Sequence, residues 1–547
     1  MTGNKRKIYK ILLPILFFVG VVMGLLLGKY VFDKPISPRQ EKLESILSMI
    51  ENEYVDDVDI DSIMEQMYPK LLSMLDPHSA YIPASELTAV NEDLDGSFSG
   101  VGVSFQILND TVTVIEVVPG GPSEKVGILA GDKILKADTL DLTGKNATTE
   151  NVYKHLRGKE GSTVVLKIER SNSSKPLEYS IVRGPVPVNS VDCSYMLTDN
   201  IGYVKVSKFA RNTYNEFITA LRELQSTGAD KYVIDLRGNS GGYMDQAILM
   251  VNEFLDAGRM IVFTNGKRKD MESYTFADGE GSFKQAEVTV ITDEFSASAS
   301  EIFSGAIQDN DRGLVIGRRS FGKGLVQNQT TLPDSSAVRL TVARYYTPSG
   351  RSIQKEYKLG DADRYETDIL DRYNHGEFYH SDSIKLDKSK IFKTTTGRVV
   401  YGGGGIMPDV FVPEDTTGIT SYYAAVSNAG LINKYAYKVA ANYRNVLRNA
   451  KSVEQIKKSL PRDNTLLEGF VNYAVENGVP ARWYYIRRSQ DLILRQLKAV
   501  IVRDILGYSA FIQMLNESDN SVLRAVEILE NGESPTLIKP DIKATKK

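Results

Sequence analysis

The sequence contains very little cysteine and histidine. Its 547 residues include one cysteine, Cys193, and only four histidines. A single thiol can form neither an intramolecular disulfide nor a zinc site built on several thiolates, and few imidazoles restrict metal binding and histidine-based catalysis. We therefore expect neither a metal nor another cofactor, and we interpret Cys193, which lies in an alternating run, as a packing residue.

A strong charge of either sign is also lacking. The chain has 66 Lys and Arg against 69 Asp and Glu, a net charge of −3, which argues against nucleic acid as a partner. The hydrophobic content of 42% is ordinary for globular protein. Because 547 residues are too many for one hydrophobic core, we expect several domains.

The N-terminus has the composition of a membrane segment. A basic stretch at 1–10 precedes an apolar run at 11–28, and a linker at 29–40 follows. The run could be a cleaved signal peptide, but the small residues of a cleavage site are missing, which favours an uncleaved single-pass anchor. With the basic stretch in the cytoplasm, we expect a bacterial inner-membrane protein whose bulk faces the periplasm or cell exterior.

The remaining chain changes pattern four times. Residues 41–96 are typical of short helices, and 97–186 of short strands interrupted by one helix near 149–156. Strands and helices alternate over 187–415, which predicts an α/β core with parallel strand pairs. Residues 416–535 are helical in pattern, and 536–547 form a tail.

Two serines follow predicted strands and compete as nucleophiles. Ser240, in residues 238–242 (GNSGG), matches the G-x-S-x-G elbow of α/β-hydrolases. That motif requires a histidine base, and nothing places His375 or His380 near a strand end. Ser298 lies further along the chain, between another predicted strand and the helix that it begins. At the start of a helix, serine is usually an N-cap.

A lysine between two glycines follows the next predicted strand. Loops at the same edge of a parallel sheet converge, so Lys323 can lie near Ser298. A neutral lysine can serve as the base of a serine, and burial lowers the pKa of an amine. The spacing alone leaves open that Lys323 is a solvated turn residue.

Several ordered segments together resemble the C-terminal processing (tail-specific) peptidases. The resemblance covers roughly residues 43–413 and implies a multidomain α/β protein, with a crotonase-like protease core, an N-terminal helical segment, a PDZ domain and a C-terminal helical region. The matching segments are 98–103 (FSGVGV), 235–242 (DLRGNSGG), 296–302 (SASASEI), 321–327 (FGKGLVQ), 346–351 (YTPSGR) and 405–409 (GIMPD).

This resemblance assigns roles to individual residues of the core. It implies a serine endopeptidase that forms an acyl-enzyme, with Ser298 as nucleophile, Lys323 as base and Gln327 supporting the lysine. Asp309 matches an acidic position implicated in the family, in either a supporting or a structural role. The backbone N–H groups of the expected oxyanion hole belong to Ala299, Gly241 and Gly242. Ser240 stands where such proteins often have proline, which bears on loop stiffness.

Residues 97–186 resemble a PDZ domain. The resemblance implies that a glycine loop presents N–H groups to a terminal carboxylate, while the next strand edge pairs with the peptide. Partners would be proteins or peptides with free C-termini, and Arg157 matches a gating contact of the family's PDZ domain. The loop residues are Gly100, Val101, Gly102 and Val103.

Two other functions remain as alternatives at this point. One is a catalytically silent PDZ scaffold at the membrane, and the other is an α/β-hydrolase esterase that uses Ser240. The helices at 416–535 are expected either to cover the core or to form a homodimer that positions two protease units.

Overall fold

The computed structural model describes residues 17–23, 37–108, 110–170 and 173–535. The chain divides into two compact units between Leu72 and Ser73. The described part of the first unit contains α2 (Pro38–Glu53), which Ser37 caps, and most of α3 (Ile60–Ser73). Most of the expected anchor at 11–28 lies outside the described residues, and no helix within the described ranges has the length and apolarity needed to span a membrane.

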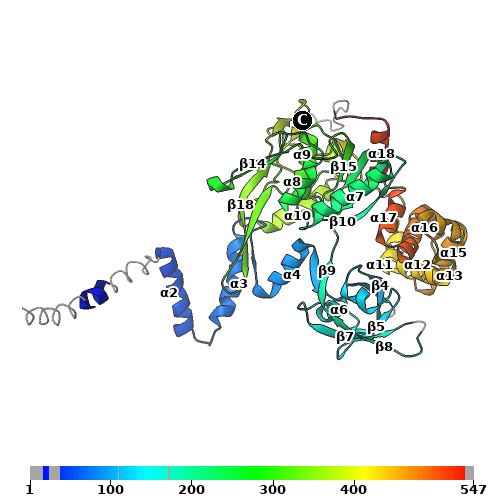
Figure 1. The fold of residues 1–547 in the computed structure, drawn as a ribbon, viewed down its shortest axis with the longest axis horizontal. Helices are drawn as coiled ribbons and strands as arrows, with labels where there is room; N and C mark the ends of the chain where they lie inside the picture. Colours follow the sequence, from blue (N-terminus) through cyan, green and yellow to red (C-terminus); the bar gives the residue numbers. More distant parts are fainter. Residues whose placement is uncertain (1–16, 24–36, 109, 171–172, 536–547) are drawn as a thin grey trace, which may run out of the picture. The chain divides into compact units, whose positions relative to one another are not determined.

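The second unit contains a six-stranded sheet, whose strands β10 and β15 are labelled in Figure 1. All its neighbouring strands are parallel except the first pair, β10 and β11, which confirms the α/β core with parallel pairing. In spatial order the strands are β10 (Val191–Met196), β11 (Ile201–Val206), β12 (Lys231–Asp235), β15 (Glu287–Thr292), β16 (Leu314–Gly317) and β21 (Val410–Phe411).

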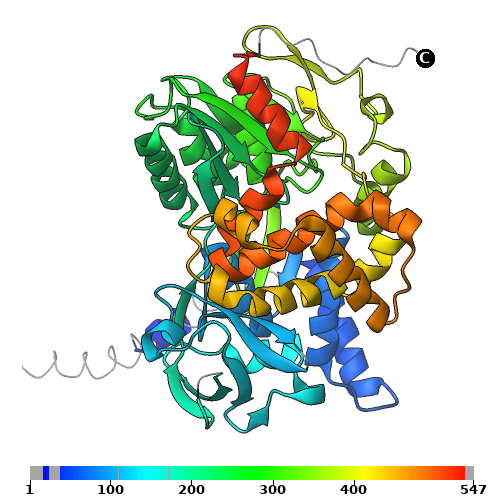
Figure 2. The ribbon, with the colours of Figure 1, turned by 90° about the vertical axis from the view of Figure 1, so that its right-hand side faces the viewer.

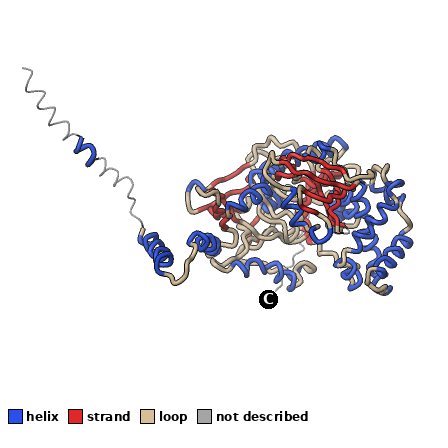
Figure 3. Tube along the Cα trace, turned by 90° about the horizontal axis from the view of Figure 1, so that it is seen from below, coloured by secondary structure: helices blue, strands red, loops and turns tan. Residues whose placement is uncertain are grey.

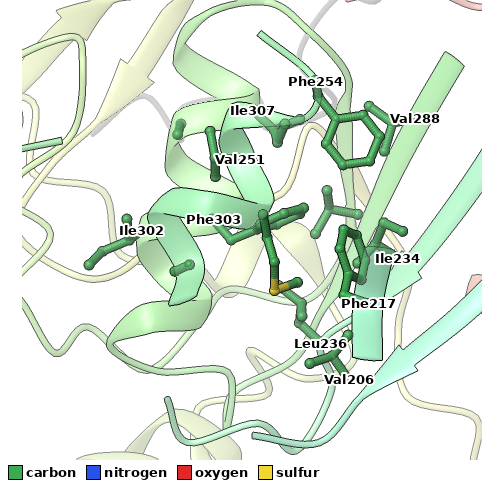
Figure 4. Close-up of a cluster of buried hydrophobic side chains, with 14 of the residues drawn as sticks. Val206, Phe217, Ile234, Leu236, Val251, Phe254, Val288, Ile302, Phe303 and Ile307 are labelled. Carbon is green, nitrogen blue, oxygen red and sulfur yellow. The ribbon is translucent and has the colours of Figure 1, made fainter. Parts of the chain in front are cut away.

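Alternate side chains of these strands enter two different hydrophobic clusters. On one face, Ile234 and its neighbours pack against α7 (Thr213–Thr227), α8 (Met244–Asn252) and α9 (Ala299–Asp309). Figure 4 shows the aromatic centre of this cluster, where Phe303 lies between the helices and the sheet. A parallel sheet needs such cover on both faces, so its strands are almost wholly apolar.

The last helix covers the opposite face of the central sheet. Helix α18 (Asn520–Glu530) packs against β12, β15 and β16, and Figure 2 shows it in red against the green strands. Its buried residues include Val522, Ala525 and Leu529, a helical spacing that predicts one apolar stripe. These side chains of α18 belong to the hydrophobic cluster on this face of the sheet. Cys193 belongs to the same cluster and is buried, as expected.

A second, antiparallel sheet of five strands lies in the same unit and was not predicted as such. Its longest strand, β18 (Ala337–Tyr346), pairs with three others, because ten residues offer room for partners along both edges. The others are β1 (Ala80–Ile82), β13 (Met260–Gly266), β14 (Ser273–Phe276) and β17 (Leu325–Thr331). Helices α4 (Ala84–Asp95) and α10 (Ala362–Asn374) and the hairpin β19 (Ile391–Lys393) and β20 (Val399–Tyr401) complete this region.

The expected PDZ region has its own sheet and its own hydrophobic cluster. Strand β3 is at the edge of the order β3-β4-β5-β7-β8, and among the described strands it pairs only with β4. The elements are β2 (Ser97–Gly100), β3 (Val103–Leu108), β4 (Thr111–Val117), α5 (Pro122–Val126), β5 (Lys133–Ala137), β6 (Leu140–Asp141), α6 (Thr149–Leu156), β7 (Thr163–Glu169), β8 (Leu177–Val182) and β9 (Gly184–Pro187).

The helices that follow the core form a group without strands (Figure 3). They share one hydrophobic cluster centred on residues such as Phe470 and Leu497. The group comprises α11 (Ser421–Asn428), α12 (Leu431–Asn442), α13 (Arg444–Leu447), α14 (Val453–Ser459), α15 (Asp463–Glu476), α16 (Trp483–Leu506) and α17 (Tyr508–Asn516).

Candidate active site

A cleft of about 460 Å³ is lined by residues that follow strands of the central sheet and by residues of the antiparallel sheet. Ser298 and Lys323 both line it, together with residues of α4, the glycine loop after β12 and strands β17 and β18. Loops at one edge of a parallel sheet converge in this way. The structure therefore brings together the two residues that sequence reasoning could only place on neighbouring loops.

Ser298 occupies a strained turn between β15 and α9. Its φ of 56° and ψ of −114° lie where side chains other than glycine are rare. Such strain is common where a nucleophile must project from a strand-to-helix turn. Ser298 is half-buried and lines the cleft, whereas the buried hydroxyls of Ser296 and Ser300 donate to backbone carbonyls. The accessible serine of this motif is thus Ser298.

The glycine loop after β12 lies against the nucleophile. A Cβ at Gly241 would come within 2.7 Å of the Ser298 Cβ, and one at Gly242 would come within 2.1 Å of the Phe209 carbonyl oxygen. Both positions also have positive φ, so only glycine fits. The Gly241 N–H donates to Oδ1 of Asn239 at 2.9 Å. Of the three N–H groups expected to form the oxyanion hole, that of Gly241 is thus engaged within its own loop.

Glu301 connects the loop of the nucleophile with the loop of the lysine. Its carboxylate accepts the backbone N–H of Ser298 at 2.9 Å and that of Lys323 at 2.8 Å. It also accepts the Gly322 N–H at 2.7 Å and the Ser320 hydroxyl. Burial raises the pKa of Glu301, while these donors oppose that rise. Sequence reasoning missed this role, although serine followed three residues later by glutamate is a capping-box signal.

The environment of Lys323 favours its neutral form. Burial lowers the pKa of Lys323, the charge of Arg339 lowers it further, and Glu301 and Asp76 oppose the shift. The Nζ donates to Oε1 of Gln327 at 3.3 Å. The other end of the Gln327 amide donates to the carbonyl of His78, so the expected supporting glutamine is held in place.

Two further side chains brace this region. The buried hydroxyl of Tyr345, in β18, donates to the carbonyl of Ser298 at 3.0 Å and contacts that of Lys323. The ring of His78 is edge-on to Tyr365, and its Nε2 lies 2.9 Å from the tyrosine hydroxyl. Burial lowers the pKa of His78 to about 4, and the charge of Lys323 contributes to this shift. His78 is therefore neutral near pH 7, which suits a structural role.

Asp309 does not line the cleft. It forms a fully buried ion pair with Arg351, at 2.7 Å, and accepts the backbone N–H of Ser349. This arrangement holds the turn after β18 against the C-terminal end of α9. The geometry thus favours the structural one of the two roles expected for Asp309.

The competing serine has no imidazole partner. Ser240 is exposed and lines the same cleft, but none of the described residues lining it is a histidine. His375 ends α10, where its Nδ1 contacts the carbonyl of Asp371. The arrangement needed for an α/β-hydrolase triad at Ser240 is therefore absent from the described part of the chain.

The expected peptide-binding loop connects β2 to β3. The carbonyls of Val101 and Gly102 accept N–H groups of Ser123 and Val118, which fixes the loop, and Gly102 has a φ of 78°. Because β3 has only one strand neighbour in the part of the chain that the structure describes, its other edge can accept an extended peptide. Arg157 stacks on the ring of Phe98, 4.2 Å from its centroid, and lies 5.0 Å from that of Tyr153. It does not line the cleft.

Comparison with known proteins gives matches to three family models. Family models match at 200–363 (peptidase family S41), 99–181 (PDZ domain) and 422–507 (a family of unknown function, DUF8443). A carboxy-terminal-processing protease of Bartonella bacilliformis is 36% identical over 313 residues, covering 56% of this chain and 71% of that protein. The carboxy-terminal processing protease CtpB of Bacillus subtilis is 32% identical over 327 residues, covering 59% and 67%.

Among solved structures, the photosystem II D1 C-terminal processing protease is similar, with 29% identity and a TM-score of 0.33. The match covers 58% of this chain and 91% of that one. By its sequence relatives, the chain belongs to the carboxy-terminal processing proteases of peptidase family S41, and it is a serine-type peptidase with a PDZ domain. The family resemblance and the enzyme class predicted from the motifs are confirmed, and the silent scaffold is set aside.

Proposed function

We propose that Ser298 and Lys323 form the catalytic dyad of this peptidase. Neutral Lys323 accepts the Ser298 hydroxyl proton while Oγ attacks the scissile carbonyl. Lys323 then gives that proton to the leaving amine, and the C–N bond breaks to leave an acyl-enzyme. A water deprotonated by Lys323 hydrolyses the ester and restores Ser298. The N–H groups of Gly242 and Ala299 would stabilise the oxyanion.

One observation carries this proposal: Glu301 accepts backbone N–H groups of both Ser298 and Lys323. A single buried carboxylate thereby fixes the nucleophile loop and the base loop in one cleft. The depressed pKa of Lys323 supports its role as a base, because only the neutral amine accepts a proton. The side-chain oxygen of Gln327 accepts a hydrogen bond from the Lys323 amine and so orients it.

PDZ domains bind peptide C-termini, and we propose that residues Gly100, Val101, Gly102 and Val103 hold the substrate's terminal carboxylate here. The open edge of β3 would pair with the preceding residues of the tail. We propose that the stacked guanidinium of Arg157 closes this site when no peptide is bound. With its tail bound there, the substrate would be cut by Ser298 at a peptide bond upstream of the substrate's own C-terminus.

The dyad is tested by comparing Ser298→Ala, Lys323→Ala and Ser240→Ala on one peptide with a free C-terminus. The first two variants should lose nearly all turnover while keeping their circular dichroism spectra. Ser240→Ala should keep most of its activity, since no histidine stands near Ser240 in the described cleft. Activity lost only in Ser240→Ala would support the esterase-type alternative instead.

We also propose, from the sequence, that residues 11–28 anchor the chain in a bacterial inner membrane with its bulk facing the periplasm or cell exterior. The basic stretch at 1–10 supports this orientation. Fractionation of cells and protease treatment of spheroplasts test it. Recovery of a soluble form that begins near residue 31 would show a cleaved signal peptide instead.

A homodimer through the helical region at 416–535 is a further proposal. Trp483 and Tyr484 at the start of α16 are 45% and 68% exposed, and exposed aromatic residues are enriched in interfaces. Light scattering of residues 37–547 should give a dimer mass that Tyr484→Asp reduces. The matched control is Tyr274→Asp, on exposed β14. A monomeric wild type would end the dimer proposal.

A further inference from the structure

The cleft around Ser298 is lined by basic side chains without acidic ones. Lys208, Lys323 and Arg339 line it, and none of the lining residues in the described chain is Asp or Glu. A cleft with walls of low dielectric concentrates the field of such charges. When Lys323 is neutral, as a base must be, Arg339 still contributes positive charge to the cleft wall.

Arg339 is held in the cleft wall by a short chain of hydrogen bonds. It faces Gln329 across the β17–β18 pair, and its Nη2 donates to Oε1 of Gln329 at 2.9 Å. The Gln329 amide in turn donates to Oδ1 of Asn91, on α4, also at 2.9 Å. Both ends of the Gln329 amide are thus in use, and the guanidinium is oriented before any ligand arrives.

Among the side chains that the structure describes, no Asp or Glu forms an ion pair with Arg339, whose guanidinium donates to Gln329. By contrast, Arg351 pairs with Asp309 and Arg237 pairs with Asp235. A guanidinium has five N–H donors, and Gln329 takes only one of them. Arg339 therefore keeps donors suited to a carboxylate.

We propose that Arg339 selects substrates that carry an acidic side chain close to the scissile bond. The inference rests on the proposed function of Ser298 and Lys323 and adds a second criterion to tail recognition. An aspartate or glutamate of the extended substrate would accept from the Arg339 guanidinium at the cleft wall. A lysine or arginine at that position would be repelled by Arg339.

The position of Arg339 near the base gives the same contact a second consequence. The charge of Arg339 contributes to the lowered pKa of Lys323. A substrate carboxylate paired with Arg339 would partly offset that contribution. Selectivity is best measured as a ratio between peptides on one enzyme form. The change that a variant such as Arg339→Gln makes in the base of the free enzyme is common to all peptides and cancels in that ratio, whereas the offset by a bound substrate carboxylate is part of the selectivity.

The test uses peptides that share one free C-terminal tail and differ at a single site. Glu, Gln or Lys is placed in turn at each of the residues flanking the cleavage point, and kcat/KM is compared by internal competition. Because the tail is constant, binding to the PDZ domain contributes equally to every peptide. The wild type should favour Glu over Lys at one or more positions by roughly three- to tenfold, and the ratio should fall with added salt.

Three variants assign the effect to Arg339. Arg339→Gln should bring the Glu-to-Lys ratio close to one, and Arg339→Glu should invert it. Arg344→Gln is the matched control, because Arg344 is an exposed residue of the same strand that does not line the cleft. It should leave the ratio unchanged.

The outcomes separate this inference from the proposed dyad. A wild type that cleaves the Gln peptide through Ser298 but shows no preference at any position would overturn the acidic selectivity alone. A ratio that survives in Arg339→Gln would also overturn it. Equal cleavage of the Gln peptide by the wild type and by Ser298→Ala would refute the dyad itself.

Discussion

Glu301 accepts the backbone N–H of Lys323 at 2.8 Å, across 22 positions of the chain. The same carboxylate accepts the N–H of Ser298, so the base loop is positioned relative to the start of α9 by one side chain. A glutamine of the same shape has only one oxygen acceptor, and its NH₂ group would meet backbone donors. The arrangement therefore depends on the carboxylate and not on the volume of the side chain.

Glu301→Gln is expected to lower kcat by about 100-fold, because a displaced reacting group costs that order of rate. KM for a peptide with a free tail should change much less, since the expected PDZ site is separate. Steady-state kinetics measure both values, with circular dichroism as the check on folding. Glu272→Gln, an exposed residue before β14, is the control. A variant with unchanged kcat would show that Glu301 does not position the dyad.

The pH dependence of kcat/KM should report the titration of Lys323. Burial and Arg339 lower the pKa of Lys323, and only the neutral amine is active, so activity should rise with pH and level off below the range of a free lysine. Arg339→Gln removes a positive charge, which raises this pKa and moves the rising limb to higher pH. A limb that stays in place, or moves to lower pH, would contradict this assignment. Arg344→Gln should leave the profile unchanged.

Asp309→Ala tests whether the buried carboxylate is structural. Its loss leaves Arg351 charged and unpaired in the core, which costs about 3–5 kcal/mol. Urea unfolding followed by fluorescence should therefore move to clearly lower denaturant concentration. The exposed pair of Asp270 with Arg268 provides the control, since Asp270→Ala should change stability by less than about 1 kcal/mol. A variant of normal stability but without turnover would assign Asp309 a direct part in catalysis.

Much of the core could be predicted because its strands are apolar and its helices periodic. Parallel strand pairing was expected over 187–415 and is observed there, and the one helix expected within 97–186 is present at Thr149–Leu156. Strand β17 was missed because its sequence, LVQNQTT, is mostly polar, as befits a strand that lines a cleft and is largely exposed. Its place in a sheet comes from pairing with β18, which no local pattern shows.

The site was predictable where a motif marks a residue, as for Ser298 and Lys323. Contacts that join distant segments could not be read from the sequence. Glu301 resembles an ordinary helix cap, and Tyr345 an ordinary strand residue, until the fold brings Lys323 to both. Likewise, α18 has the stripe of any amphipathic helix, and only the structure shows that it covers the central sheet.

Tail recognition is tested with one peptide in two forms, with a free or an amidated C-terminus. Amidation removes the negative charge that the loop at Gly100 and Gly102 is proposed to bind. At sub-saturating concentration the amidated form should be cleaved at least about tenfold more slowly, since a charged hydrogen bond contributes about 1.5–3 kcal/mol. Equal rates would mean that this loop does not read the terminus.

The most direct test of the dyad is covalent labelling with a fluorophosphonate, which reacts with activated serine hydroxyls. Tryptic mass spectrometry should find the added phosphonyl group on Ser298 in the wild type. The label should be absent or greatly slowed in Lys323→Ala and in Lys323→Arg, because arginine stays protonated and cannot accept the serine proton. A label on Ser240, or undiminished labelling of Ser298 in Lys323→Arg, would contradict the Ser298–Lys323 dyad.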